Sequence, residues 1–128
     1  MRRILAGLSA LLLLGWLAAC APLVQTGGPP AAAPALAGES FIASDGAPLP
    51  LRVWHSATRP AAVIVALHGF NDYSNAWTAA GKWWAAQGIT TYAYDQRGFG
   101  DTADRGVWAG TDLLCRDLRE FIALVERR

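Results

Sequence analysis

AAVIVALHGF, residues 61–70, is the stretch that indicates the fold most directly. Residues 61–67 are apolar without interruption and lack the alternation of a strand that faces water on one side. A run of this kind is typical of a strand in a parallel sheet, where helices cover both faces. His68 and Gly69 then begin a loop at the carboxyl end of a buried strand, where sheets of this type place ligands.

The residues that follow predict a helix and a second strand. Asn75 is a suitable N-cap for a helix that reaches Gln87, and Gly88 is a suitable stop directly after it. The predicted apolar face of this helix consists of Trp77, Ala80 and Trp84. Residues 89–94, ITTYAY, predict the next strand.

A last helix is predicted to begin at Thr111, again a suitable N-cap. Its predicted apolar face consists of Leu114, Leu118, Phe121, Ile122 and Val125. The opposite face carries Asp112, Arg116, Glu120 and Glu126, among which ion pairs one turn apart are expected. Cys115 lies within this helix and is interpreted as a small buried thiol.

Before the apolar run, residues 40–43 and 49–55 predict two strands joined at an Asp45-Gly46 turn. An antiparallel hairpin followed by strand, helix, strand and helix predicts an α/β fold with right-handed crossovers over residues 39–128. A helix ending near Arg128 should lead into a further parallel strand. We therefore interpret residues 39–128 as the N-terminal part of a larger domain with an incomplete sheet.

The first 19 residues have the layout of a secretory signal, because Arg2 and Arg3 precede the apolar residues 4–19. Leu17-Ala18-Ala19-Cys20 resembles the lipobox of bacterial lipoproteins at every position. The resemblance implies that residues 1–19 are removed and that Cys20 is acylated, which places the protein at the bacterial cell envelope, facing the periplasm or at the surface. The alternative is an ordinary signal peptide with a Cys at that position by chance.

Residues 20–38 contain Pro22, Pro29, Pro30 and Pro34 and show neither helix nor strand periodicity. This composition predicts a flexible or partly extended tether between Cys20 and the folded domain.

The composition excludes several classes of protein. Of 128 residues, 53% are hydrophobic and 16% charged, which excludes a disordered protein. A formal net charge of +1 provides no electrostatic basis for nucleic-acid binding. We find no metal-ligand spacing and no phosphate or nucleotide motif, so no cofactor is expected.

Two motifs follow the two predicted parallel strands: LHGFND at residues 67–72 and YDQRGFGDT at residues 94–102. With the order of strands and helices, they resemble the α/β-hydrolase superfamily. The resemblance is to the branch containing monoacylglycerol lipases, lysophospholipases and serine aminopeptidase-type hydrolases, and it spans residues 39–128.

The resemblance implies a role for the first loop. The backbone N–H of Phe70 would donate to the oxyanion of a tetrahedral intermediate, and Gly69 would let the backbone approach the substrate closely. A plain tight turn is the alternative for both residues. Asn71, Asp72 and Tyr73 would border the acyl pocket, with a solvated loop as the alternative.

The remaining motif residues are interpreted as structural. They are His68, Asp95, Arg97, Gly98 and Gly100, which would shape the two loops through hydrogen bonds and permissive glycines. His68 is not expected to be the catalytic base, because the base of this superfamily lies nearer the C-terminus.

The chain departs from the superfamily at one decisive point, since no G-x-S-x-G occurs in the 128 residues. The nucleophile, the acid and the base of the triad are therefore missing, and we expect this chain alone to be inactive. Its parent is predicted to be a lipid-anchored serine hydrolase of carboxylic esters such as acylglycerols or lysophospholipids. The alternatives are a non-catalytic truncated lipoprotein or binding module, and an Asp-nucleophile hydrolase of the dehalogenase or epoxide hydrolase type.

Overall fold

The computed structural model describes residues 23–128. The predicted signal segment and Cys20 lie outside the described residues. The elements, in chain order, are β1 (Ala35–Ala37), β2 (Ser40–Ile42), β3 (Pro48–Trp54), β4 (Ala62–Val65), the 3-10 helix η1 (Ser74–Trp77), α2 (Thr78–Ala86), β5 (Ile89–Tyr94) and α3 (Thr111–Val125). This order agrees with the predicted α/β fold of a hairpin followed by alternating strands and helices.

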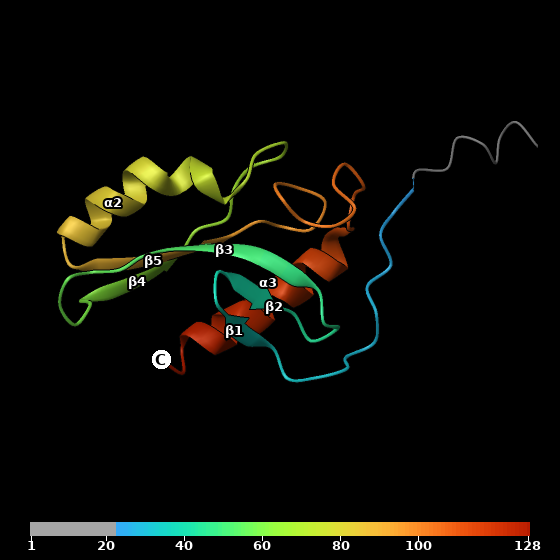
Figure 1. Ribbon diagram of the computed structural model, residues 1–128, viewed down its shortest axis with the longest axis horizontal. Coiled ribbons are helices and arrows are strands. Elements are labelled where there is room, and N and C mark those ends of the chain that lie inside the picture. The colour runs from blue at the N-terminus through green and yellow to red at the C-terminus, as the bar shows by residue number, and fades with distance from the viewer. Residues whose placement is uncertain (1–22) are drawn as a thin grey trace, which may run out of the picture.

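The strands form one mixed sheet in the order β1-β2-β3-β5-β4 (Figure 1). The predicted hairpin is confirmed, because β2 and β3 pair antiparallel with Phe41 opposite Leu49. The predicted parallel pair is confirmed as well, because β4 and β5 run parallel with Ile64 opposite Thr91. Within residues 23–128, β4 is an edge strand, and Val63 is 47% exposed there.

The two helices lie on opposite sides of the sheet, α2 above it and α3 below it in Figure 1. On the α2 side, Gly81 packs directly on the ring of Trp54, and an added Cβ at Gly81 would lie 2.5 Å from that ring. Trp77 stacks on Trp84 at 6.1 Å between ring centroids, so these two residues lie on one face, as predicted. Glycine at position 81 therefore sets how closely α2 approaches β3.

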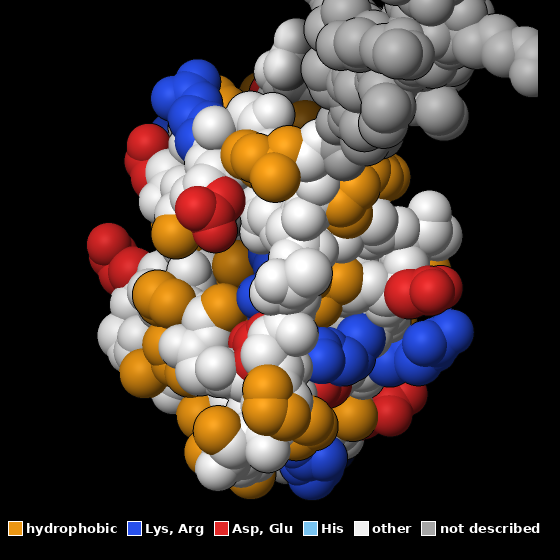
Figure 2. Space-filling model, turned by 90° about the vertical axis from the view of Figure 1, so that its right-hand side faces the viewer, with side chains coloured by type: hydrophobic (Ala, Val, Ile, Leu, Met, Phe, Trp, Pro, Cys, Tyr) orange, Lys and Arg blue, Asp and Glu red, His pale blue; other side chains and the backbone are white. Residues whose placement is uncertain are grey.

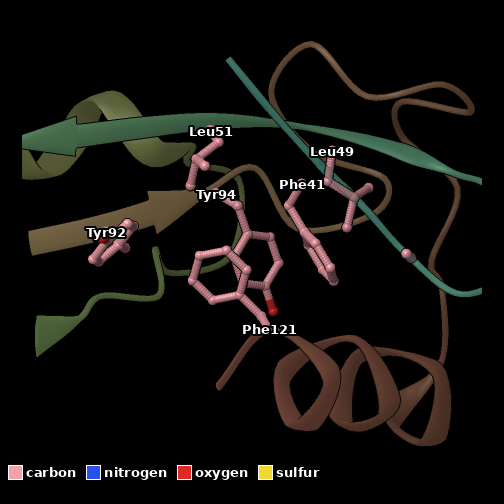
Figure 3. Close-up of a cluster of buried hydrophobic side chains, with 7 residues drawn as sticks. Phe41, Leu49, Leu51, Tyr92, Tyr94 and Phe121 are labelled. Carbon is pink, nitrogen blue, oxygen red and sulfur yellow. The ribbon is translucent and has the colours of Figure 1, made fainter. Parts of the chain in front are cut away.

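The hydrophobic core lies between the sheet and α3 (Figure 3). Phe121 of α3 packs on Phe41 at 5.0 Å and on Tyr94 at 4.9 Å between ring centroids. All three rings are at most 1% exposed. Burial of a side chain of this size contributes about 1.5–3 kcal/mol, so these rings fix α3 against the sheet.

The predicted helix caps are wrong. Asn75 lies inside η1, and its Oδ1 accepts a hydrogen bond from the Thr78 hydroxyl at 3.0 Å instead of from a helix N–H. Gly110, with φ of 78°, precedes α3, and Thr111 is the first helical residue. A short 3-10 turn and a glycine turn replace the side-chain caps at these two positions.

The predicted apolar face of α3 is also partly wrong. The buried residues of α3 are Leu113, Asp117 and Phe121, whereas Ile122 is 37% exposed and Leu114 and Leu118 are only half-buried. The helix is turned so that the Asp117 carboxylate faces the core, where it meets a cationic partner. Hydropathy alone cannot place a buried carboxylate on the inner face of a helix.

The predicted tether is wrong from Val24 onward. Ala35–Ala37 form strand β1, which pairs antiparallel with β2, and Val24 forms a β-bridge with Trp108. Backbone hydrogen bonding makes both contacts, so they need no periodic side-chain pattern and leave no signal in the sequence. Within residues 23–128, no helix is long and apolar enough to cross a bilayer.

Candidate active site

The loops that follow β4 and β5 are joined by two hydrogen bonds, both donated by Gln96 and accepted by His68. The backbone N–H of Gln96 donates to Nε2 of His68 at 2.9 Å. The Gln96 side-chain amide also donates to the His68 carbonyl at 2.7 Å. The two motif loops are therefore fixed relative to one another at the carboxyl edge of the sheet.

The imidazole of His68 is fully occupied by the protein. Because Nε2 accepts a hydrogen bond from the Gln96 N–H, the ring hydrogen is on Nδ1, which donates to the Gly69 carbonyl at 2.9 Å. The side chain is buried, and its ring packs edge-on against Phe99 at 5.5 Å. With both nitrogens engaged, His68 positions the loop and has no lone pair to offer a substrate.

Phe70 projects from this fixed loop. Its side chain is 78% exposed, and a tight turn follows in which the Asp72 N–H donates to the Gly69 carbonyl at 3.3 Å. Among residues 23–128, the Phe70 N–H donates to no protein acceptor. An added Cβ at Gly69 would meet no atom within 4 Å, so the space on the side-chain side of Gly69 is open.

The structure brings the three predicted pocket residues together with the second motif. Asn71, Asp72 and Tyr73 line a cavity of about 190 Å³. The other lining residues are Gly98, Gly100, Arg105 and Gly106. Arg105 was not singled out from the sequence, because a lone Arg in a loop rich in charged residues carries no pattern.

Asp95 holds the loop after β5 in shape. Its fully buried carboxylate accepts the backbone N–H of Ser74 through Oδ1 and that of Asp101 through Oδ2, both at 2.9 Å. Gly100 has φ of 56° and lies against this carboxylate so closely that a Cβ would collide with it. The Asp95 carboxylate is therefore used by two backbone donors and is not exposed for acid–base chemistry.

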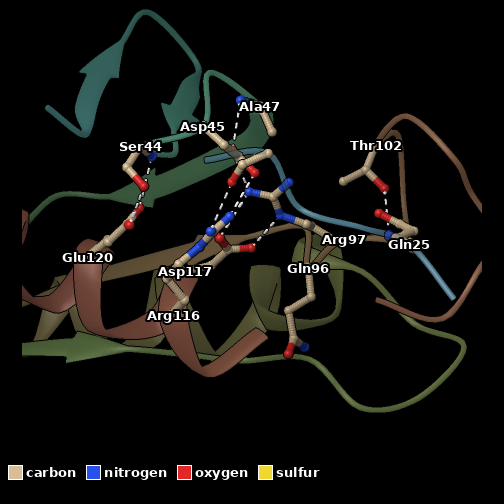
Figure 4. A network of polar contacts seen from close by, with 12 residues as sticks. Gln25, Ser44, Asp45, Ala47, Gln96, Arg97, Thr102, Arg116, Asp117 and Glu120 are labelled. Atoms are coloured by element: carbon tan, nitrogen blue, oxygen red, sulfur yellow. Dashed lines mark hydrogen bonds and ion pairs between the residues drawn. The ribbon is translucent and has the colours of Figure 1, made fainter. Parts of the chain in front are cut away.

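Arg97 lies at the centre of a buried ionic network (Figure 4). Its Nε and Nη2 donate to the two carboxylate oxygens of Asp117 at 2.6 and 3.0 Å. Nη2 also donates to Oδ1 of Asp45 at 2.7 Å, and Nη2 of Arg116 donates to the other oxygen of Asp45 at 2.7 Å. The network ties the loop after β5 to α3 and to the β2–β3 turn.

Burial and charge act in opposite directions on these groups. Burial raises the pKa of Asp45, but the hydrogen bonds from Arg97 and the Ala47 N–H, with the charges of Arg97 and Arg116, outweigh it. The net result is a pKa below the usual value. Burial lowers the pKa of Arg97, but the carboxylates of Asp117 and Asp45 outweigh it and raise the pKa above its usual value. Arg97 and Asp45 are thus both charged at neutral pH.

Sequence reasoning missed most of this network. It expected ion pairs one turn apart among the charged residues of α3, whereas Arg116 binds Asp45 and Glu120 accepts hydrogen bonds from the backbone N–H and hydroxyl of Ser44. The one available signal was Asp117, which lies four residues from both Leu113 and Phe121 on the inner face of the helix. In the part of the chain that the structure describes, no cluster of three His, Cys, Asp or Glu is placed to hold a metal.

Comparison with known proteins identifies this arrangement. The model of the serine aminopeptidase S33 family matches residues 58–128, which contain both motif loops and the strands and helices that carry them. The chain belongs to the serine aminopeptidase S33 family.

Two curated relatives resemble this S33 chain. It is 30% identical over 83 residues to a monoacylglycerol lipase of Mycolicibacterium smegmatis, which covers 65% of this chain and 28% of that protein. It is 34% identical over 61 residues to an uncharacterized abhydrolase domain-containing protein of Dictyostelium discoideum, which covers 48% of this chain and 6% of that protein. The S33 chain thus spans less than a third of either relative.

Solved structures show the α/β-hydrolase fold. A soluble variant of monoglyceride lipase from Saccharomyces cerevisiae matches 80% of this chain and 33% of its own, with a TM-score of 0.56 and 24% identity. A lipase in its open form matches 73% of this chain and 31% of its own, also with a TM-score of 0.56 and 24% identity. The predicted fold class is thereby confirmed as a partial α/β-hydrolase fold.

Proposed function

We propose that the complete protein is a lipid-anchored serine hydrolase of the cell envelope that acts on carboxylic esters such as acylglycerols or lysophospholipids. This chain supplies its oxyanion loop. The observation that carries the proposal is the Phe70 N–H, which has no acceptor among residues 23–128 and lies on a loop fixed by His68 and Gln96.

The proposed mechanism is acyl transfer through a serine. A Ser outside these 128 residues attacks the ester carbonyl while a His, also outside them, takes the Ser proton and gives it to the alcohol that leaves; an acid orients that His. Water then hydrolyses the acyl-enzyme by the same steps and frees the Ser. The carbonyl oxygen becomes an oxyanion, and the Phe70 N–H donates to it. The donor is fixed before the reaction because the His68–Gln96 bonds hold its loop, so little reorganisation opposes the developing charge.

The substrate class is supported by two observations. The curated lipase relative acts, by its name, on monoacylglycerols. The loop itself presents an exposed apolar ring at Phe70, and the three residues that follow Phe70 in the chain line a cavity. An acyl chain is the substrate group that such a ring would contact. The Asp-nucleophile chemistry and the non-catalytic module are the alternatives that an activity measurement must separate.

The anchor and the envelope location are proposed from the N-terminal sequence. Arg2 and Arg3, the apolar residues 4–19 and Cys20 support processing to an acylated Cys20. Conversion of Cys20→Ser should move the protein from the membrane fraction to the soluble fraction, while an unchanged membrane fraction would contradict the anchor.

Removing the Phe70 N–H tests the catalytic proposal. In the complete protein, Phe70→Pro removes the donor and Phe70→Ala keeps it while removing the ring. We expect kcat for a monoacylglycerol to fall about 10²–10³-fold more in Phe70→Pro than in Phe70→Ala. Equal kcat values in the two variants would contradict the oxyanion role.

A second measurement distinguishes loss of the N–H from misfolding of the Phe70→Pro variant. Replacing the Gly69–Phe70 amide by an ester removes the same N–H without adding a ring to the backbone. The ester variant should lose kcat to the same degree as Phe70→Pro while retaining the near-UV circular dichroism of the wild type. An ester variant with wild-type kcat would contradict the role.

A further inference from the structure

The segment that precedes β1 is bound to the domain at its N-terminal end. The Gln25 N–H donates to the Trp108 carbonyl at 2.8 Å, and the Gln25 side-chain amide donates to the Val107 carbonyl at 2.7 Å. Val24 forms the β-bridge with Trp108. Residues 24 and 25 therefore lie along the loop that leads into α3.

The same segment is bound at two further points. Arg116 Nη1 donates to the Gly28 carbonyl at 3.1 Å. The N–H groups of Ala31 and Ala32 both donate to the Ser44 carbonyl, at 2.7 and 3.1 Å. We call residues 24–32 the strap, because it crosses from the α3 loop to the β2–β3 turn in contact with both (Figures 1 and 4).

The strap shortens the connection between Cys20 and the domain. A flexible coil of residues 21–38 would have an average span of about 23 Å. With the strap bound, only residues 21–23 separate Cys20 from Val24, and a segment of that length reaches at most about 14 Å from Cα to Cα. Whatever Cys20 is attached to must lie close to the surface around Val24.

That surface is apolar. Four exposed hydrophobic side chains form it, and we call them the strap-end surface: Leu23, Val24, Phe70 and Trp108. Their exposed fractions are 77%, 43%, 78% and 41%. The Phe70 and Trp108 rings lie 6.2 Å apart between centroids, and both contact Phe99. Figure 2 shows hydrophobic side chains in several groups on the face of the molecule that it draws.

We propose that the strap-end surface lies on the lipid bilayer to which Cys20 is attached, with the Trp108 and Phe70 rings in the interface. This proposal rests on the anchor proposed above. Two observations select a bilayer as the occupant: Leu23, only three residues after Cys20 in the sequence, belongs to this surface, and the surface combines exposed aliphatic and aromatic side chains. Tryptophan in particular favours the boundary between headgroups and acyl chains.

The proposed contact gives the candidate active site an orientation. Phe70 belongs both to the strap-end surface and to the oxyanion loop, so the bilayer contact directs that loop toward the lipid. A lipid ester in the outer part of the bilayer could then reach the loop without first dissolving in water.

Quenching of tryptophan fluorescence tests the proposal. The complete protein, purified with its native N-terminus, is reconstituted in phosphatidylcholine vesicles whose acyl chains carry bromine near the headgroup. Bromine quenches only nearby indoles. Subtracting the spectrum of Trp108→Phe from that of the wild type isolates the signal of Trp108. The matched control is Trp83→Phe, since Trp83 on α2 is 63% exposed and lies outside the strap-end surface.

We expect brominated lipid to quench Trp108 at least twofold and Trp83 by less than a tenth. Leu23→Asp is a second variant that leaves the core intact, and it should reduce quenching of Trp108, whereas Ala79→Asp on α2 should not. If Trp108 is not quenched in vesicle-bound protein, the proposed contact of this surface with the bilayer is wrong, while the proposed anchor is unaffected. The same conclusion follows if another part of the protein is found to cover this surface. Failure of the wild type to bind vesicles, with no difference from Cys20→Ser, overturns the anchor as well.

Discussion

Arg97 and Asp117 form a two-point ion pair in which Nε and Nη2 of the guanidinium donate to the two carboxylate oxygens at 2.6 and 3.0 Å. Both side chains are at most 8% exposed. The pair joins the loop after β5, which faces His68, to the inner face of α3. The geometry of the candidate active site therefore depends on a buried ionic contact as well as on apolar packing.

Loss of Arg97 should destabilise the fold strongly. Arg97→Met leaves the Asp117 carboxylate buried without a cation, and we expect the free energy of unfolding to fall by about 3–5 kcal/mol in urea denaturation at pH 7. The control is Arg119→Met on the exposed side of α3, which should change it by less than about 0.5 kcal/mol. Similar losses in both variants would mean that the ion pair adds no stability.

Acidification should act through Asp45. Because the pKa of Asp45 is lowered in the folded state, its contribution to stability is present above the unfolded pKa of about 3.9 and is lost as the pH falls further. Asp45→Asn should be less stable than the wild type at pH 7, and the gap should narrow as the pH falls from 5 to 3. A gap that stays constant over this range would contradict the assignment.

Gly100 should tolerate substitution less well than Gly106. Both have positive φ, 56° and 88°, but a Cβ at Gly100 would collide with the Asp95 carboxylate and one at Gly106 would meet no atom within 4 Å. Gly106→Ala should lose about 1 kcal/mol of stability from backbone strain alone. Gly100→Ala should lose at least about 1 kcal/mol more, and equal losses in thermal unfolding would show that the Asp95 contact is not needed.

The free edge of β4 should make the 128-residue chain self-associate. Within residues 23–128, β4 pairs only with β5, and the run 61–67 carries neither charge nor proline. Val63→Lys at this edge should increase the monomer fraction in sedimentation velocity at micromolar concentration, while Ala79→Lys on α2 should not. A wild-type chain that is monomeric under these conditions would contradict the expectation.

The strands and helices other than β1 and η1 were predictable because they follow from side-chain periodicity. The apolar run 61–67 indicated a strand and the Asp45-Gly46 turn indicated a hairpin, since both signals are local. The expected cover on both faces of that strand is not present within residues 23–128, where Val63 is 47% exposed. The two motif loops were predictable for the same reason, since each directly follows a strand. Their meeting through His68 and Gln96 follows from the parallel pairing of β4 and β5.

The contacts that were not predictable are long-range and polar. Asp45 and Arg116 are 71 residues apart, and the strap contact of Gln25 with Val107 spans 82 residues. Neither has a sequence period, because each depends on where separate elements come together in space. The orientation of α3 was mispredicted for the same reason: the contact of Asp117 with Arg97 places Asp117 on the inner face, and hydropathy gives no sign of that contact.

The central claim is that this chain supplies the oxyanion half of a serine hydrolase, and the reading frame beyond the codon for Arg128 tests it most directly. The account predicts an apolar strand followed by G-x-S-x-G within about 10–20 residues, which would set the nucleophile beside the free edge of β4. A stop codon at that position, or an Asp in place of the Ser, would contradict it.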